Sequence, residues 1–214
     1  EKHLSAIMLM GMVAVVMMYI AGTHPKWLLL GAAGAAVFLL VYIRFMGYAG
    51  DRVTAWRHPE LDPGDTGYQI LQSLYAIGSG GFFGLGPGKS RQKYLYLPFQ
   101  YNDYIFAIVC EELGLVGALG IMALFALLIF RGYRIARQAE NRFSTSLAAG
   151  LISLIAVQTI LNLCVVTNLL PSTGIALPFF SYGGTALAVN LGEMGIVLNI
   201  SRSGKKRTIQ EAAN

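Results

Sequence analysis

The sequence has little charge for its length. Asp, Glu, Lys and Arg make up only 13% of its 214 residues, whereas hydrophobic residues make up 55%. A water-soluble domain could not keep that much apolar surface from water, so the composition excludes an ordinary soluble protein and predicts an integral membrane protein. The two cysteines, Cys110 and Cys164, fall in apolar runs, which favours packed thiols over a disulfide.

The start of the sequence also has little that resembles a signal peptide. The chain opens with Glu1, Lys2 and His3 and enters an apolar run at once, without a basic start region. This abrupt beginning suggests a fragment of a longer protein. The formal net charge of +5 is typical of membrane proteins with basic cytoplasmic loops, so we expect no nucleic-acid partner.

Five apolar runs approach the roughly 20 residues that a bilayer-spanning helix needs. They cover residues 4–21, 27–46, 104–130, 144–167 and 185–200. We therefore expect an all-α integral membrane protein, in which residues 1–214 form a single membrane domain with five transmembrane helices. Residues 47–102 are expected as a large outer loop within that domain, and residues 201–214 as a cytoplasmic tail.

Basic residues near the ends of the spans predict the orientation. The connection between the third and fourth runs carries Arg131, Arg134, Arg137 and Arg142, and the tail carries Arg202, Lys205, Lys206 and Arg207. Basic short loops stay in the cytoplasm, and both segments can do so because two spans separate them. The C-terminus is then cytoplasmic, and the loop 47–102 lies outside.

Within the outer loop, residues 66–77 (TGYQILQSLYAI) predict one short helix. Its apolar side chains recur along a stripe formed by Tyr68, Leu71, Leu74 and Tyr75. At about twelve residues the helix is too short to span a bilayer, so an amphipathic interfacial or a re-entrant helix fits better. Gln69 and Ser73 lie on another side and are candidates for contact with a polar substrate.

A glycine-rich, basic segment, residues 78–93, follows this helix. The outer-loop cations that could bind phosphate groups are Lys89, Arg91, Lys93, Arg52 and Arg57. The letters GLGPGKS resemble a nucleotide-binding phosphate loop, but Phe83 occupies the place of that pattern's first glycine and no strand precedes it. What remains is a mobile cationic surface suited to phosphate. The alternative is a solvated basic loop near anionic lipid heads.

Several polar side chains fall inside the apolar runs. Carboxylates there are costly, which makes Glu111, Glu112 and Glu193 functional candidates, with a structural hydrogen bond as an equally open alternative. For three amides an interhelical hydrogen bond that serves assembly is favoured: Gln158, Asn162 and Asn190.

The connection between the fourth and fifth runs is rather apolar for an outer loop. It reads NLLPSTGIALPFFSYGGTAL and contains a turn formed by Ser181, Tyr182, Gly183 and Gly184. We expect this connection to dip into the mouth of the helix bundle.

Three segments resemble the SEDS family (shape, elongation, division and sporulation), whose members include FtsW, RodA and SpoVE. They are residues 68–98, 103–114 (DYIFAIVCEELG) and 169–184 (LLPSTGIALPFFSYGG). The resemblance implies a bundle of about ten spans with both ends in the cytoplasm, of which this chain would be the second half. The orientation predicted from the arginines agrees with it.

The resemblance also implies a function. Such proteins are peptidoglycan glycosyltransferases of the bacterial cytoplasmic membrane that polymerise lipid II on its outer face. They pair with a class B penicillin-binding protein among other divisome or elongasome membrane proteins. The family's catalytic aspartate matches Asp103, which would act as general base on a sugar hydroxyl. The departing pyrophosphate leaves room for a divalent cation, although the sequence contains no metal-ligand pattern.

Other readings of the same residues stay open. From sequence alone, Asp103 is typical of a helix N-cap, since it immediately precedes an apolar run, and the resemblance favours the catalytic role. A lipid II flippase would use the buried polar residues as a path across the membrane. A non-catalytic scaffold for a penicillin-binding protein would need neither feature. The concentration of unusual chemistry on one side favours the enzyme.

Overall fold

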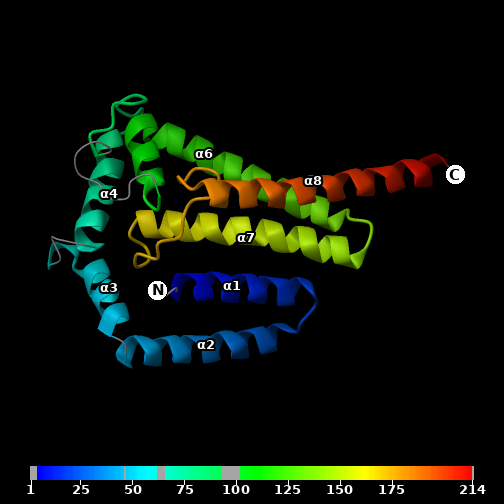
Figure 1. Cartoon of the computed structure of the whole chain (residues 1–214), viewed down its shortest axis with the longest axis horizontal. Helices are drawn as coiled ribbons and strands as arrows, with labels where there is room; N and C mark the ends of the chain where they lie inside the picture. The colour runs from blue at the N-terminus through cyan, green and yellow to red at the C-terminus, as the bar shows by residue number, and fades with distance from the viewer. Residues whose placement is uncertain (1–3, 46, 62–65, 93–101, 214) are drawn as a thin grey trace.

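The computed structural model describes residues 4–45, 47–61, 66–92 and 102–213, and this part of the chain is helical without strands. The helices, labelled as in Figure 1, are α1 (Leu4–Ile20), α2 (Pro25–Phe45), α3 (Gly47–Arg57), α4 (Thr66–Gly80), α6 (Ile105–Arg137), α7 (Arg142–Val166) and α8 (Gly184–Ala213). A short 3-10 turn, Pro59–Leu61, follows α3. The expected all-α fold is thereby confirmed.

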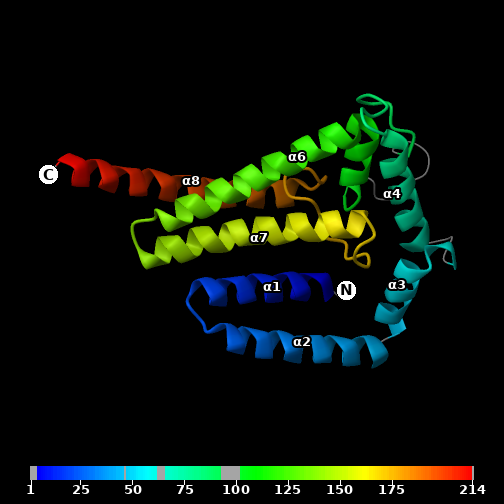
Figure 2. The ribbon, with the colours of Figure 1, turned by 180° about the vertical axis from the view of Figure 1, so that it is seen from behind.

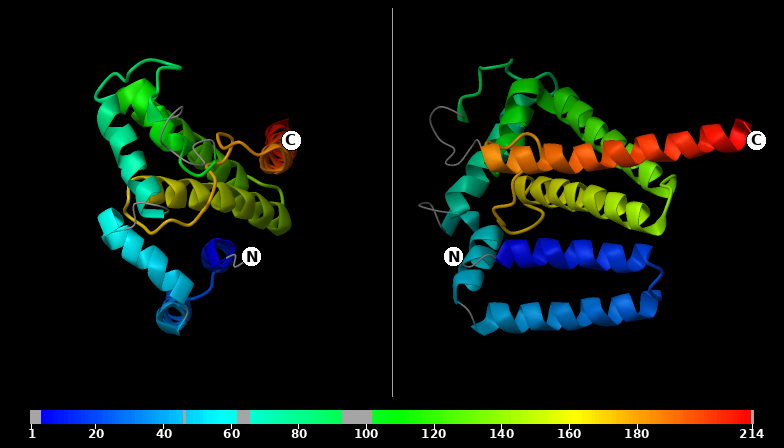
Figure 3. Two further views of the ribbon diagram at one scale, coloured as in Figure 1. Left: turned by 60° about the vertical axis from the view of Figure 1, so that its left-hand side comes forward. Right: turned by 45° about the vertical axis from the view of Figure 1, so that its right-hand side comes forward.

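The long helices lie side by side, and α3 and α4 cross one end of them (Figures 1 and 2). The α1–α2 and α6–α7 connections lie at the opposite end, together with the C-terminus. Helix α7 packs against α1, α6 and α8, and is therefore central (Figure 3). Two described helices, α6 and α7, are long and apolar enough to cross a membrane. The count of five spans stays a prediction.

Burial distinguishes these two helices. In the most apolar window of α7, 56% of the residues are buried, whereas the figure for α6 is 17%. Exposed apolar side chains of α6 include Leu115, Val116, Leu119, Leu124, Leu127 and Phe130. Such a surface is unfavourable in water and suits hydrocarbon.

The third predicted run, 104–130, falls on α6, which is long and apolar enough to span, but α6 breaks at Gly114, whose φ is 67° and ψ −169°. The glycine-rich segment enters the helical hydrogen-bond ladder there. The amides of Leu115 and Val116 donate to the carbonyls of Gly81 and Phe82, at 2.9 and 3.2 Å. Inserting a partner into the ladder of a helix is a common cause of a sharp kink. A short segment, 105–113, therefore precedes the long one.

The reverse bonds complete this junction. The amide of Leu85 donates to the carbonyl of Glu111 at 2.9 Å, and that of Gly86 donates to Glu112 at 3.0 Å. The two backbones lie so close that a Cβ on Gly84 would come within 2.2 Å of the Glu112 carbonyl oxygen. Here the glycines permit close approach of two backbones, which is a different use from the mobility that the sequence suggested.

Helix α4 confirms the predicted short helix and extends it to Gly80. Its buried face differs from the predicted apolar stripe, since Ile70, Ser73 and Ala76 are buried while Tyr75 is 58% exposed. Small side chains on this face let α4 pack closely against α6 and α7. Helix α3 lies in the predicted outer loop, outside the one short helix that was expected there. Helix α8 continues through most of the expected tail.

Candidate functional site

Asp103 lies in the turn before α6, at the end where α3, α4 and the α7–α8 connection gather (Figure 1). Its carbonyl oxygen accepts a hydrogen bond of 2.7 Å from Nδ2 of Asn162, a buried residue of α7. The same Nδ2 donates to the carbonyl of Ile175 at 2.8 Å. Since an amide NH2 carries two protons, it can serve both carbonyls. One side chain of α7 thus ties the backbone of Asp103 to the α7–α8 connection.

The helix-capping alternative for Asp103 is wrong in this structure. The residue at the N-cap position of α6 is Tyr104, and among the described residues no side chain caps that helix start. The first turn closes through the backbone, where the amide of Ala107 donates to the Tyr104 carbonyl at 3.0 Å. The carboxylate of Asp103 is therefore not used for the helix.

The Asp103 carboxylate instead faces the α7–α8 connection. A Cβ added at Gly174, whose φ is +68°, would lie 3.5 Å from Asp103 Oδ2. On the same connection, the Ser172 carbonyl accepts a bond of 3.0 Å from Nη1 of Arg52. Burial raises the pKa of Asp103 above its usual value, and the nearby positive charge of Arg52 opposes that rise. A raised carboxyl pKa favours proton acceptance near neutral pH.

Ser181 fastens the other end of this connection. Its hydroxyl donates to the carbonyl of Asn102 at 2.6 Å and accepts from the amide of Leu177 at 2.7 Å. Ser181 therefore holds the backbone at Asn102, the residue that directly precedes Asp103. Of the other residues in the predicted turn, Tyr182 is 84% exposed, and Gly184 is the first residue of α8.

The cationic segment is anchored by a buried carboxylate. Glu111 is 1% exposed, and it accepts hydrogen bonds from the hydroxyl of Ser90 and from the amide of Arg91. Lys89 and Arg91 are exposed on this segment, as a binding surface for an anion requires. Lys93 lies outside the described residues.

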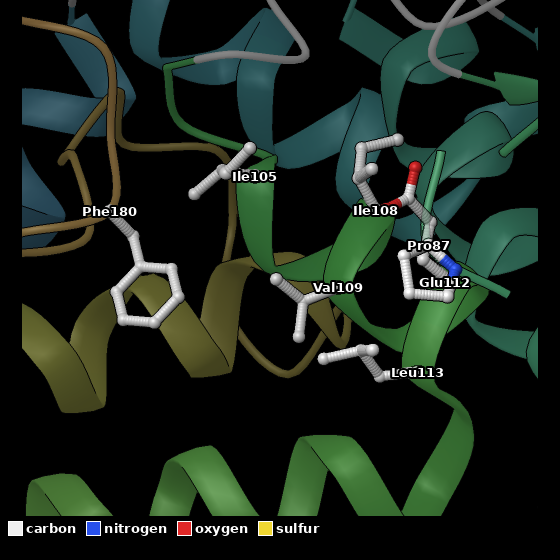
Figure 4. Close-up of a pocket in the computed structure, with 7 residues that line it drawn as sticks. All are labelled: Pro87, Ile105, Ile108, Val109, Glu112, Leu113 and Phe180. Atoms are coloured by element: carbon white, nitrogen blue, oxygen red, sulfur yellow. The ribbon is translucent and has the colours of Figure 1, made fainter. Parts of the chain in front are cut away.

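A cavity of about 410 Å³ connects this segment with the start of α6 (Figure 4). It is lined by Pro87, Ile105, Ile108, Val109, Glu112, Leu113 and Phe180. One lining residue, Ile105, follows Asp103 by two residues along the chain. The lining is mostly apolar, and Glu112 is its one carboxylate. Such a cleft suits the apolar part of an amphiphilic molecule.

Other predicted site residues lie apart from this cluster or are used structurally. Ser73 is fully buried, and its hydroxyl donates to the carbonyl of Val166 at 2.9 Å, which joins α4 to the end of α7. The structure thus gives Ser73 a packing role, and its predicted contact with substrate stays a prediction. Gln69 is half-buried on α4, and Arg57 is exposed at the end of α3. Their substrate contacts stay predictions.

Glu193 lies in a second cavity, of about 340 Å³, between α7, α8 and their connection. Gln158 of the fourth apolar run and Asn190 of the fifth also line it, so polar groups from two runs are brought together. Oε2 of Glu193 is inaccessible and has no hydrogen-bond partner within the described part of the chain. Among those residues, no group of three His, Cys, Asp or Glu side chains could hold a metal.

The sequence did not identify the residues that hold Asp103 in place. Asn162 was expected to make an assembly hydrogen bond, and its bonds to two backbone carbonyls confirm a structural role next to the site. Gly174 and Ser172 were part of a recognised motif without an assigned role. A glycine inside an apolar, proline-containing connection was the available signal for close approach to a functional group.

Residues 1–206 match the model of a family described as cell cycle protein, which covers FtsW, RodA and SpoVE. The chain belongs to this FtsW/RodA/SpoVE family. It is 43% identical over 201 residues to a probable peptidoglycan glycosyltransferase FtsW of Geobacter sulfurreducens, covering 94% of this chain and 54% of that protein. It is 46% identical over 189 residues to the stage V sporulation protein E of Bacillus subtilis, covering 88% and 51%.

Two solved structures resemble the family fold seen here. A chain of a peptidoglycan synthase complex, described as coordinating polymerization and crosslinking, superposes with a TM-score of 0.78 at 26% identity, covering 94% of this chain and 56% of that one. RodA of Thermus thermophilus superposes with a TM-score of 0.61 at 25% identity, covering 94% and 50%. The chain thus spans about half the length of the relatives that it matches.

Proposed function

We propose that this chain carries the outer-face catalytic site of a peptidoglycan glycosyltransferase that polymerises lipid II. The observation that carries the proposal is the held aspartate: Asp103 has its backbone fixed by Asn162, its carboxylate unused by the helix, and its pKa raised by burial. The names of the FtsW relatives support the reaction class.

The reaction needs a base and a place for a leaving anion. A sugar hydroxyl attacks the anomeric carbon of the donor sugar, and Asp103 accepts the hydroxyl proton as the new glycosidic bond forms. The bond from that carbon to the lipid pyrophosphate breaks, and the pyrophosphate leaves with the electron pair. General-base catalysis contributes roughly 10²–10⁴ to the rate of such a step. The cations of the glycine-rich segment, Lys89 and Arg91, would stabilise the departing anion.

The membrane arrangement is part of the proposal. Five spans place Asp103 and the glycine-rich segment outside, with the arginine-rich α6–α7 connection and the C-terminus in the cytoplasm. The partners are lipid II, a class B penicillin-binding protein, and other membrane proteins of division or elongation. The support is that the start of α6, which follows Asp103, and the arginine-rich α6–α7 connection lie at opposite ends of the helices (Figure 1), and that a solved neighbour belongs to a synthase complex.

A second candidate is a lipid II flippase. The observation that favours it is the cavity between α7 and α8, which collects Gln158, Asn190 and Glu193 within an otherwise apolar bundle. A path for a polar head group would need such residues along the whole width of the membrane. The scaffold alternative requires neither cavity nor base.

Asp103→Asn in the full-length protein separates these functions. The amide keeps the size of the side chain and cannot accept a proton at ordinary pH. Glycan formation from purified lipid II and translocation of lipid II across vesicles are measured on one preparation. We expect glycan synthesis to fall by at least about 10² with unchanged protein level. Normal glycan synthesis would refute the catalytic proposal, and loss of translocation alone would favour the flippase.

A further inference from the structure

Glu111 is the buried carboxylate that the proposed reaction does not use. Both of its oxygens are engaged: Oε2 accepts from the hydroxyl of Ser90, and Oε1 accepts from the amide of Arg91 at 3.0 Å. Ser90 is itself only 2% exposed. A buried carboxylate is costly unless donors satisfy it, so these two bonds account for its position.

The backbone of Glu111 also holds the same segment. Its carbonyl accepts from the amide of Leu85 at 2.9 Å, while its side chain binds Ser90 and Arg91. The intervening chain closes a turn in which the amide of Lys89 donates to the Gly86 carbonyl at 3.1 Å. One residue of α6 therefore binds both ends of a short cationic segment, residues 85–91.

This attachment relates the cations to the candidate base. Glu111 belongs to the short part of α6, residues 105–113, that begins two residues after Asp103 and ends at the break at Gly114. The next residue, Glu112, lines the cavity that Pro87 and Ile105 share (Figure 4). The segment with Lys89 and Arg91 is thus fixed to the same short helix that follows Asp103.

We propose that Glu111 is a positioning residue, whose carboxylate holds Ser90 and Arg91 so that the exposed Lys89 and Arg91 cations meet the leaving pyrophosphate in a fixed place relative to Asp103. The inference rests on the proposed function, because it assigns the segment an anionic leaving group. Glu111 takes no proton in this scheme. Its contribution is to reduce the conformational freedom that the glycine-rich segment would otherwise lose on binding substrate.

Glu111→Gln and Glu111→Ala distinguish positioning from proton transfer. A glutamine can accept from the Arg91 amide through its carbonyl and donate to the Ser90 hydroxyl, which can act as acceptor. In the full-length protein with lipid II as substrate, we expect Glu111→Gln to keep its KM within about threefold of the wild type. Glu111→Ala loses both bonds, so its KM should rise about tenfold or more. The pH profile of kcat/KM should keep its shape, because Asp103 still sets it.

Hydrogen exchange of the peptide that contains residues 86–92 provides a readout that is independent of catalysis. Exchange should accelerate in Glu111→Ala and stay near the wild-type rate in Glu111→Gln. Leu119→Ala, on the exposed face of α6, is the matched control with unchanged exchange. If Glu111→Ala does not fold, Ser90→Ala removes one of the two bonds and should give a smaller change in the same direction.

Two results would overturn the inference. One is unchanged exchange in the Glu111→Ala or Ser90→Ala protein, which would mean that other contacts hold the segment. The other is a Glu111→Gln protein as inactive as Glu111→Ala, which would assign acid–base chemistry to the carboxyl group. Failure of the proposed function is a separate result, because active Asp103→Asn protein would refute catalysis while leaving the exchange data to report on the anchor.

Discussion

At the scale of single residues, the properties of Asp103 follow from a competition between burial and one cation. Burial raises the pKa of its carboxyl group, and Arg52 acts in the opposite direction. Arg52 is itself held by its bond to the Ser172 carbonyl. The protein thus fixes the Arg52 cation beside a carboxyl group whose ionised form is disfavoured by burial. Carboxyl groups with pKa values perturbed in this way are found preferentially at functional sites.

The first prediction concerns stability. Because the folded-state pKa of Asp103 is raised, the folded protein is fully stable when this group is protonated and loses stability as pH rises through that pKa. Asparagine never ionises, so Asp103→Asn should be at least as stable as the wild type at neutral pH. The gap in Tm should shrink as pH falls towards about 4, the ordinary pKa of aspartate. Thermal unfolding in detergent at several pH values measures it.

Glu60→Gln is a control of opposite sign. The pKa of Glu60 is lowered by a hydrogen bond to its own backbone and by His58, so the stability that its ionised form contributes is lost as pH falls. The change in Tm on substitution should be small because the side chains of Glu60 and His58 are both exposed. An Asp103→Asn protein that unfolds at a lower temperature than the wild type at neutral pH would show that the carboxylate is favourably paired.

The second prediction concerns the charge of Arg52. Arg52→Gln removes the cation that lowers the pKa of Asp103, so the pKa should rise further. The acidic limb of the pH profile of kcat/KM should then move to higher pH. Arg52→Lys keeps the charge and should leave the limb near its wild-type position. Equal shifts in both variants would assign the effect to the lost hydrogen bond to Ser172 rather than to charge.

At the scale of elements, the break in α6 explains why a glycine-rich segment lies beside the candidate base. The sequence predicted the apolar run from 104, but not the break, because the partners that replace the helical ladder come from residues 81–86. Helical periodicity reports only on neighbours a few residues apart. The start of α4 was predictable, because its pattern depends only on residues close together in the sequence. Its buried face depends on contact with α6 and α7 and was not predictable.

The third prediction tests this junction. A methyl group at Gly114 would lie 2.3 Å from the Gly84 amide nitrogen, and its φ and ψ belong to a region that is nearly exclusive to glycine. Gly114→Ala should therefore cost several kcal/mol of stability, with about 1–3 from backbone strain alone. It should also reduce polymerisation, because the cationic segment loses its attachment. Thermal unfolding and lipid II polymerisation measure both effects.

Gly120→Ala is the matched control for that substitution. It lies on the long part of the same helix, and apart from its chain neighbours and the helix's own backbone no atom is within 4 Å of the added methyl group. Alanine favours helix over glycine by about 1 kcal/mol, so this variant should be as stable as the wild type or slightly more so. A Gly114→Ala protein that behaves like Gly120→Ala would contradict the described junction.

At the scale of the whole molecule, the polar chemistry divides between the two ends of the helices. The start of α6, which follows Asp103, and helix α3, which carries Arg52, lie at one end (Figure 1), and the α6–α7 connection with Arg137 and Arg142 lies at the other. The arginine pattern predicted this division from sequence, because the positive-inside rule depends on composition near the span ends rather than on packing. The enclosure of Asp103 by three distant segments needed the structure.

The last prediction assigns these ends to the two sides of the membrane. Phe83 is 85% exposed at the Asp103 end, and Gln138 is exposed where α6 ends. In a protein with Cys110 and Cys164 replaced by alanine, we introduce Phe83→Cys or Gln138→Cys and treat intact cells with a membrane-impermeant thiol reagent. Because basic connections stay in the cytoplasm, the cysteine at 83 should react and the one at 138 should not. Permeabilised cells provide the control, in which both react. Labelling at 138 with protection at 83 would invert the topology and remove Asp103 from the face where the proposed substrate is polymerised.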